Sequence, residues 1–153
     1  MFIVGLLSGV LLMVVIAIVV IPKLLFIENE SQFGFEETVS LLSSETTKHQ
    51  WAMPHQYDLQ ETMKKHGFEV NPVKVFSVCK PDLANRILGS DDERLVAAMM
   101  PCRIAVYQKN NGKTYLSRMN AGLFSKLTGR KTGKVMAEAG TGSEKILLQI
   151  IQK

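Results

Sequence analysis

Hydrophobic positions along this chain fall into two patterns. Residues 2–21 hold 17 apolar residues, two Gly and one Ser, with no charge. A helix of about 20 such residues covers about 30 Å, the thickness of the hydrocarbon core of a bilayer. Farther along, apolar residues recur at the spacings of amphipathic helices and half-buried strands. The pattern predicts a transmembrane anchor over residues 1–27, a polar linker over 28–34 and a compact domain over 35–153.

We interpret the N-terminal segment as an uncleaved anchor rather than a cleaved signal peptide. A secretory signal has a basic start, a shorter apolar stretch and a small-x-small cleavage site. Here Met1 alone precedes the apolar run, and no such site follows it. Lys23 is the only basic residue near either end, so the positive-inside rule leaves the orientation open. We therefore expect a single-pass membrane protein.

The domain alternates predicted helices and strands. Capping residues, helical spacing and glycine stops predict helices over 35–47, 58–67, 81–89, 121–128 and 132–151. Runs rich in β-branched and aromatic residues predict extended segments over 51–57, 73–79, 102–109 and 113–119.

Glycines and asparagines refine these elements. Asn110-Asn111-Gly112 predicts a hairpin turn between the last two strands. Gly140 and Gly142 predict a break in the last helix, after which Thr141 and Glu144 restart it. The expected fold is an α/β (α+β) two-layer sandwich, with a small mixed sheet and helices on one face.

Several segments of the domain resemble one known family. They are WAMP at 51–54, VKV at 73–75, CKP at 79–81, MMPCRIAVY at 99–107, GKTY at 112–115 and RMN at 118–120. The chain is similar to the "domain of unknown function 302" family, in particular to a branch with one N-terminal span. The resemblance implies a compact α/β fold that dimerises. We expect the chain to work as a homodimer or as a subunit of a larger membrane assembly. It also favours a domain outside the cytoplasm, and it implies no catalytic residue.

Two cysteines are the most specific candidates for chemistry. Cys79 ends one predicted strand and Cys102 begins another, so antiparallel pairing would bring both thiols to one edge of the sheet. Three interpretations stay open: buried unreactive thiols, a disulfide, or ligands of a soft metal or a haem iron. The candidate ligand or redox residues are Cys79, Cys102, Met99, Met100, Arg103 and Met119. No metal is established, because the three histidines lack zinc-ligand spacing with the cysteines.

A basic stretch follows the hairpin. Lys109–Lys134 holds seven basic residues and no acid, which accounts for the net charge of +4. It is a solvated face, a surface for anionic lipid headgroups, or a site for an anionic ligand or acidic partner. The candidate surface residues are Lys126, Arg130, Lys131 and Lys134. We expect the lipid bilayer as a partner and no nucleic acid, because no nucleic-acid-binding motif is present.

Catalytic motifs are missing from the sequence. It has no glycine-rich phosphate loop, no HExxH and no nucleophile elbow, which makes an enzyme the less favoured interpretation. We interpret the chain as a membrane-anchored binding or accessory module. The alternative is a redox or cofactor protein that uses Cys79 and Cys102.

Overall fold

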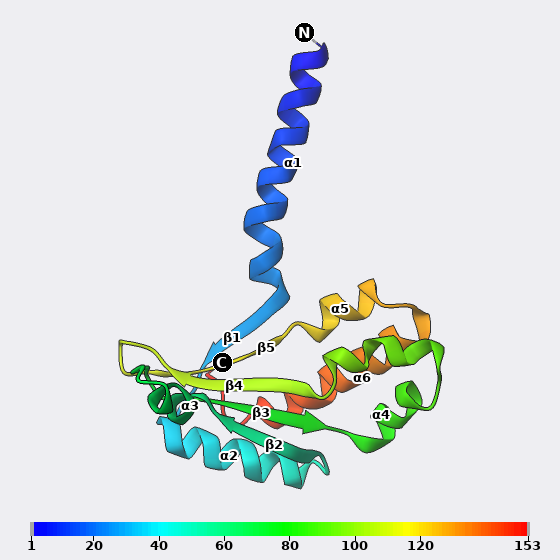
Figure 1. The fold of residues 1–153 in the computed structure, drawn as a ribbon. Helices are drawn as coiled ribbons and strands as arrows, with labels where there is room; N and C mark the ends of the chain where they lie inside the picture. The colour runs from blue at the N-terminus through cyan, green and yellow to red at the C-terminus, as the bar shows by residue number, and fades with distance from the viewer. Residues whose placement is uncertain (1, 153) are drawn as a thin grey trace.

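A long helix stands on a small two-layer domain in the computed structural model (Figure 1), which describes residues 2–152 and the side chains of residues 8–152. The elements are α1 (Phe2–Leu25), β1 (Phe26–Glu30), α2 (Phe35–Lys48), β2 (Ala52–Asp58), α3 (Leu59–Lys65), β3 (Val73–Cys79), α4 (Pro81–Leu88), the 3-10 helix η1 (Asp92–Met99), β4 (Cys102–Gln108), β5 (Thr114–Met119), α5 (Ala121–Leu127) and α6 (Arg130–Leu147).

The five strands form one sheet in the order β1-β5-β4-β3-β2, and every neighbouring pair is antiparallel. The α/β two-layer fold is confirmed, but the expected mixture of parallel and antiparallel strands is wrong. Parallel neighbours need a connection that crosses back over the sheet. Here α3 joins β2 to β3 at one end of the sheet, and α4 with η1 joins β3 to β4 at the other (Figure 1).

The segment expected to be a linker contains a strand instead. β1 pairs with β5 from Phe26 opposite Met119 to Glu30 opposite Tyr115. Just after β1, the backbone N–H of Ser31 donates to the carbonyl of Thr114 at 2.8 Å. The polar residues of β1 gave no strand pattern in the sequence. An edge strand can be polar, because it is paired on one side only and keeps much of its surface in water.

The core lies on one face of the sheet, where α2 and α6 cover it. The side chains at its centre come from three strands and two helices and are 0–1% exposed: Leu42, Phe76, Val78, Ile104, Val106, Leu116, Ile146 and Leu147. Burying one such side chain stabilises a fold by about 1.5–3 kcal/mol before the entropy of ordering is counted. The helices therefore hold to one face, as predicted.

Local signals in the sequence act as expected at two turns. The side chain of Asp58 caps α3 by accepting a hydrogen bond from the N–H of Glu61 at 2.8 Å. Gly112 has a φ of +77° in the hairpin between β4 and β5, a conformation that glycine adopts without strain.

The predicted break in the last helix is wrong, because α6 runs without interruption from Arg130 to Leu147. Close packing explains its glycines. A Cβ atom on Gly140 would lie 2.7 Å from the Cβ of Ala121, and one on Gly142 would lie 2.6 Å from Cζ2 of Trp51. The glycines let α6 approach α5 and the start of β2, so the helix keeps them despite their low helical propensity.

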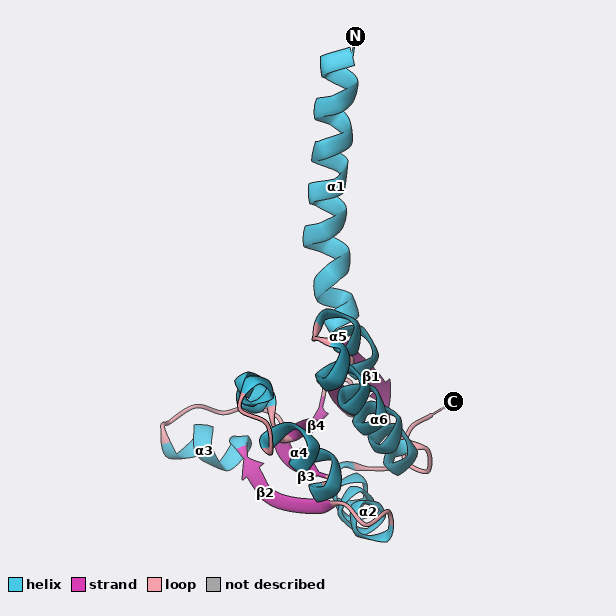
Figure 2. Ribbon diagram, turned by 90° about the vertical axis from the view of Figure 1, so that its right-hand side faces the viewer, coloured by secondary structure: helices cyan, strands magenta, loops and turns pink. Residues whose placement is uncertain are grey.

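The N-terminal helix joins the sheet directly. Ser8–Leu25 of α1 is long and apolar enough to cross a membrane, and none of it is buried against the domain. Asn120 holds its last turn: its backbone N–H donates to the carbonyl of Leu25 at 2.8 Å, and its side-chain Nδ2 donates to that of Leu24 at 3.0 Å. Figure 2 shows α5 directly below the base of α1.

Candidate functional site

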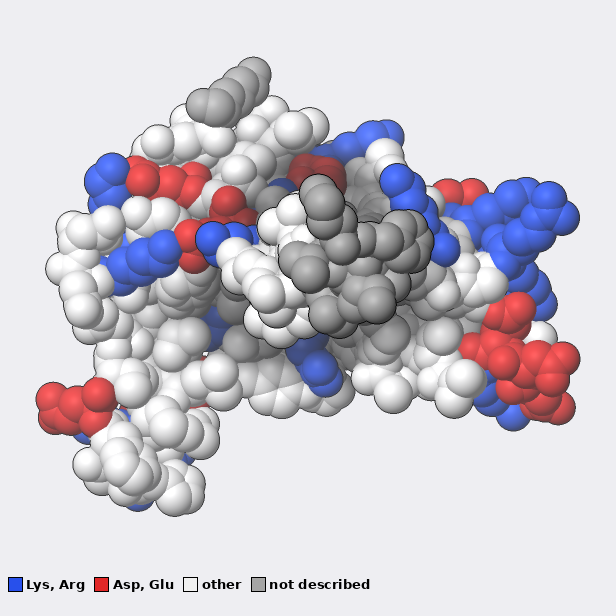
Figure 3. Space-filling view, turned by 90° about the horizontal axis from the view of Figure 1, so that it is seen from above, with Lys and Arg blue, Asp and Glu red and all other residues white. Residues whose placement is uncertain are grey.

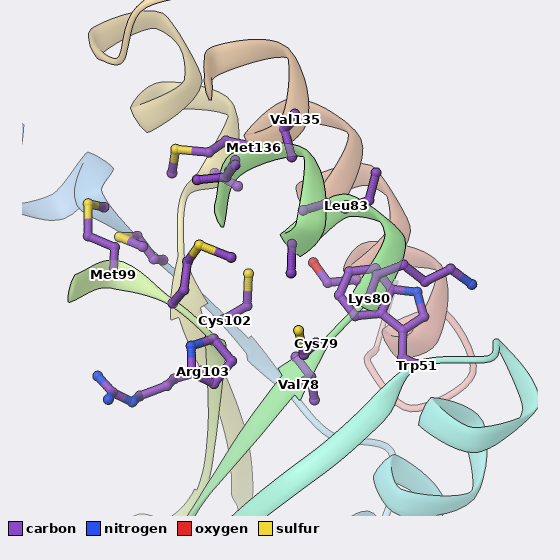
Figure 4. A pocket seen from close by; sticks show the side chains of 18 of the residues that line it. Trp51, Val78, Cys79, Lys80, Leu83, Met99, Cys102, Arg103, Val135 and Met136 are labelled. Atoms are coloured by element: carbon purple, nitrogen blue, oxygen red, sulfur yellow. The ribbon is translucent and has the colours of Figure 1, made fainter. Parts of the chain in front are cut away.

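An apolar cavity of about 80 Å³ lies at the end of the sheet where β3 ends and β4 begins. Its walls come from α4, η1, the start of α5, and α6, together with the ends of β3, β4 and β5 (Figure 4). All six candidate ligand or redox residues line this one cavity: Cys79, Cys102, Met99, Met100, Arg103 and Met119. The sequence therefore named residues that the fold brings together.

Sulfur atoms are unusually concentrated here. The cavity is lined by both cysteines and by four methionines, the three named above and Met136 of α6. Cys102 is the register partner of Val78, so Cys79 lies one position beyond it on the neighbouring strand. The strand pairing thus brings the backbones of the two cysteines close together, and both residues line the cavity.

Both thiols are free, and both are only partly buried. Burial raises the pKa of Cys79. Burial also raises the pKa of Cys102, and the neighbouring Cys79 raises it further. A raised pKa favours the neutral thiol, which is a weaker nucleophile than the thiolate. The described residues contain no group of three or more His, Cys, Asp or Glu that is arranged to hold a metal.

Charged groups around the cavity are engaged elsewhere. Lys80 Nζ donates to the carbonyls of His49 and Gln50, at 3.3 and 3.1 Å. Figure 4 shows the guanidinium of Arg103 directed away from the sulfur-bearing side chains. Both side chains therefore contribute their apolar stems to the wall and leave the interior apolar.

Arg118 is the buried charge nearest the cavity. It is 7% exposed, and its Nε and Nη1 donate to Glu144 and Asn29, each at 2.7 Å. A second donor, Nη2, also bonds Glu144, so the pair is bidentate. The sequence showed Arg118 only as one member of a basic stretch, since its partner lies 26 residues away.

Sequence reasoning missed the helical wall of the cavity. Leu83, Ala84 and Ile87 of α4 contribute to it, and so do the α6 residues Val135, Met136, Ala139 and Ser143. Each set repeats at helical spacing, which indicates a buried stripe. That signal does not show whether the stripe meets other side chains or an open space.

The basic stretch divides into two groups. Lys109 pairs with Glu28 at 2.7 Å and Lys113 with Glu30 at 2.8 Å, across the β1–β5 side of the sheet. The four predicted surface residues are exposed, and within the described part of the chain none of them lies in an ion pair: Lys126, Arg130, Lys131 and Lys134. They form what we call the free basic group.

The fold and the cavity define a small α/β domain with one antiparallel sheet, a helical layer on one face and an apolar cavity at one end. The family model for "Domain of unknown function DUF302" matches residues 27–150, and the chain belongs to this family. The match begins beyond α1.

A solved structure shares the fold. The crystal structure of an uncharacterized conserved protein DUF302 from Bacillus stearothermophilus is similar with a TM-score of 0.72 and 21% sequence identity. The similarity covers 82% of this chain and 97% of that one. No curated protein matches the chain. These comparisons establish the family and the fold, and they assign no activity.

Proposed function

We propose that this protein is a single-pass, membrane-anchored binding module whose domain holds a small apolar ligand in the sulfur-rich cavity. The observation that carries the proposal is the composition of that cavity: apolar and sulfur side chains line it, and its charged neighbours are paired or turned away. Apolar lining with few polar groups is typical of small-molecule sites. The length and hydropathy of α1 support the anchoring.

The volume of the cavity limits the ligand. A dry apolar cavity of about 150 Å³ takes a benzene molecule. At about 80 Å³ this cavity suits a ligand of a few heavy atoms, or a slightly larger one if the flexible methionines adjust. Several polar groups would be needed to hold ordered water instead, and the interior offers few.

The test uses xenon, a single apolar heavy atom that fits the volume of the cavity, as a quencher of Trp51, the only tryptophan and a residue of the cavity wall. The full chain in nanodiscs is titrated while tryptophan emission is followed. Binding in the cavity gives saturable quenching, and Ala84→Leu, which fills the cavity, abolishes the saturable part. Ala137→Leu on an exposed position of α6 is the matched control and keeps it. Linear quenching that is equal in all three proteins contradicts the proposal.

A soft metal ion is the second candidate, favoured by the six sulfur-bearing side chains that line one cavity. Thiolate and thioether ligands prefer ions such as Cu(I). Each thiol that binds must lose its proton, so the raised pKa values of Cys79 and Cys102 make binding weaken as the pH falls. A dithiol that cycles with a disulfide uses the same two residues.

Anaerobic titration with Cu(I) against a chromophoric competitor separates these possibilities. Stoichiometric binding that is lost in Cys79→Ser and in Cys102→Ser supports the metal site, and Ser143→Ala in the same wall is the control. If copper does not bind, but both thiols disappear on mild oxidation and return on reduction, the pair is a redox couple. If neither occurs, the cysteines are part of an apolar wall.

We place the domain outside the cytoplasm, on the support of the family resemblance alone. Labelling of intact cells with a membrane-impermeant maleimide tests this. The reaction is run at pH 8.5, because the raised pKa values slow it at neutral pH. Labelling of intact cells supports the placement; labelling only after lysis contradicts it. Association with a second copy or a larger assembly stays a prediction.

A further inference from the structure

We infer that residues 121–134, which we call the docking segment, lie against the headgroups of anionic lipids. The segment comprises α5, the turn that follows it and the first turn of α6. The inference rests on the proposed anchoring by α1, and it adds a second contact between the domain and the membrane.

Backbone connections place the docking segment at the membrane surface. Asn120 caps α5 by accepting from the N–H of Leu123 at 3.1 Å. The same residue bonds the carbonyls of Leu24 and Leu25, the last two residues of α1. The first turn of α5 is thereby tied to the point where α1 leaves the bilayer. In Figure 1, α5 lies beside the base of α1 and runs outward along the side of the domain from which α1 rises.

The charges of the docking segment suit anionic headgroups. The whole free basic group, Lys126, Arg130, Lys131 and Lys134, lies within it, and the segment contains no acid. A Lys or Arg near an anionic surface is attracted to it electrostatically. Figure 3, which looks down on the domain from above, shows a group of Lys and Arg side chains at one end of the domain, with a group of Asp and Glu side chains beside it.

An exposed apolar side chain distinguishes the docking segment from an ordinary solvated face. Leu127 is 71% exposed at the end of α5, directly beside Lys126. Basic residues interleaved with an exposed leucine are typical of helices that lie in the interface, with the apolar side chain below the phosphates. The anchor removes most of the entropy cost of this contact, because it already holds the segment at the surface.

Tryptophan quenching by brominated lipid tests the inference on the full chain in nanodiscs. Three single substitutions are compared after subtraction of the Trp51 signal: Leu127→Trp in the docking segment, Phe68→Trp at an exposed position beyond α3, and Leu12→Trp within α1. We expect quenching at 12 in every lipid, quenching at 127 that rises with the anionic lipid fraction, and none at 68.

Charge variants complete the test. Replacing Lys126, Arg130 and Lys131 together by Gln is expected to reduce quenching at 127 to the level at 68, while Lys64→Gln with Lys65→Gln on α3 leaves it unchanged. Quenching at 12 without quenching at 127 overturns this inference and leaves the anchoring intact. Absence of quenching at 12 overturns the anchoring itself. Quenching at 127 that ignores lipid charge overturns the role of the basic group.

Discussion

The two ends of the β4–β5 pair differ in how their polar and charged side chains are paired. At the hairpin end, Tyr107 donates to Glu28, which also accepts from Lys109 at 2.7 Å. Tyr115 stacks against Tyr107 at 6.2 Å between ring centroids, and the ammonium of Lys109 lies 4.0 Å from the centre of the Tyr115 ring. At the other end the same strands run into the cavity and toward the free basic group.

Charged groups at the hairpin end are paired within the chain, whereas in the part of the chain that the structure describes the free basic group at the other end is not. At the hairpin end, Lys109 and Lys113 form ion pairs with acidic residues of β1, the strand that follows α1. The cavity end keeps an apolar cavity and four cations without acidic partners among the described residues. The polar groups at the two ends are therefore expected to contribute differently to stability.

The largest expected effect comes from breaking the buried charge pair beside the cavity. Glu144→Ala leaves the guanidinium of Arg118, which is 7% exposed, without its carboxylate. Losing one partner of a fully buried pair costs about 3–5 kcal/mol. The side chain of Glu144 is 41% exposed, so water compensates in part and we expect a loss of about 2–3 kcal/mol.

Glu138→Ala is the matched control, because it removes a carboxylate from the same helix. Its ion pair with Arg86 is exposed on both sides, so we expect a loss of less than about 1 kcal/mol. Chemical denaturation of both variants measures the difference. Equal losses would mean that the Arg118 pair is no more than a surface contact.

A smaller loss of stability is expected from adding a methyl group where α6 packs against Trp51. In Gly142→Ala the new Cβ lies 2.6 Å from the Trp51 ring, which must move. Overpacking costs about 1–3 kcal/mol, and the gain in helix propensity returns about 1 kcal/mol, so the net loss is about 1 kcal/mol. The emission of Trp51 shifts as its surroundings change.

Gly122→Ala provides the comparison, since its Cβ meets only Asn120 Oδ1 at an ordinary 3.4 Å. We expect unchanged or slightly higher stability and unchanged Trp51 emission. Thermal unfolding and fluorescence measure both. If Gly142→Ala has the stability and Trp51 emission of Gly122→Ala, the Trp51 ring moves aside more easily than its close packing indicates.

The smallest effect is a pH dependence at the hairpin end. The hydrogen bond from Lys109, followed by that from Tyr107, lowers the pKa of Glu28 below its ordinary value of 4.5. A lowered folded-state pKa gives stability that is present above 4.5 and lost as the pH falls through the lowered value. Because the pair is exposed, we expect about 0.5 kcal/mol.

Unfolding curves of wild type and Glu28→Gln between pH 3 and 7 measure this contribution. The two proteins differ above pH 4.5 and converge in acid. Tyr107 gives the opposite sign at high pH: burial, then Glu28, raises its pKa to about 12, so its contribution is lost as the pH rises through that value. A difference that persists unchanged at pH 3 would exclude the ion pair as its source.

Local patterns in the sequence predicted most of the fold. The predicted strand over 73–79 is observed without change as β3, and the capped helix after Asp58 and the hairpin at Gly112 follow from short-range chemistry. The closeness of the Cys79 and Cys102 backbones also follows, because it depends only on two strands being antiparallel neighbours. The chemistry of the two thiols stays a prediction.

The remaining features depend on contacts between distant residues. β1 is visible only through its pairing with β5, about 90 residues later. From the sequence alone, Gly140 and Gly142 predict a break in α6. Only the structure shows that they pack closely against Ala121 and Trp51. Likewise, the split of the basic stretch depends on acids supplied by β1, and the cavity depends on helices α4 and α6 standing slightly apart.

The direct junction between α1 and β1 has a mechanical consequence. A transmembrane helix adjusts to bilayer thickness by changing its tilt. A flexible linker would absorb such a change, but here the last turn of α1 is bonded to Asn120 and its chain continues into the sheet. If α1 spans the membrane as proposed, a change in its tilt would therefore be passed to the sheet and would turn the cavity end toward the lipid or away from it.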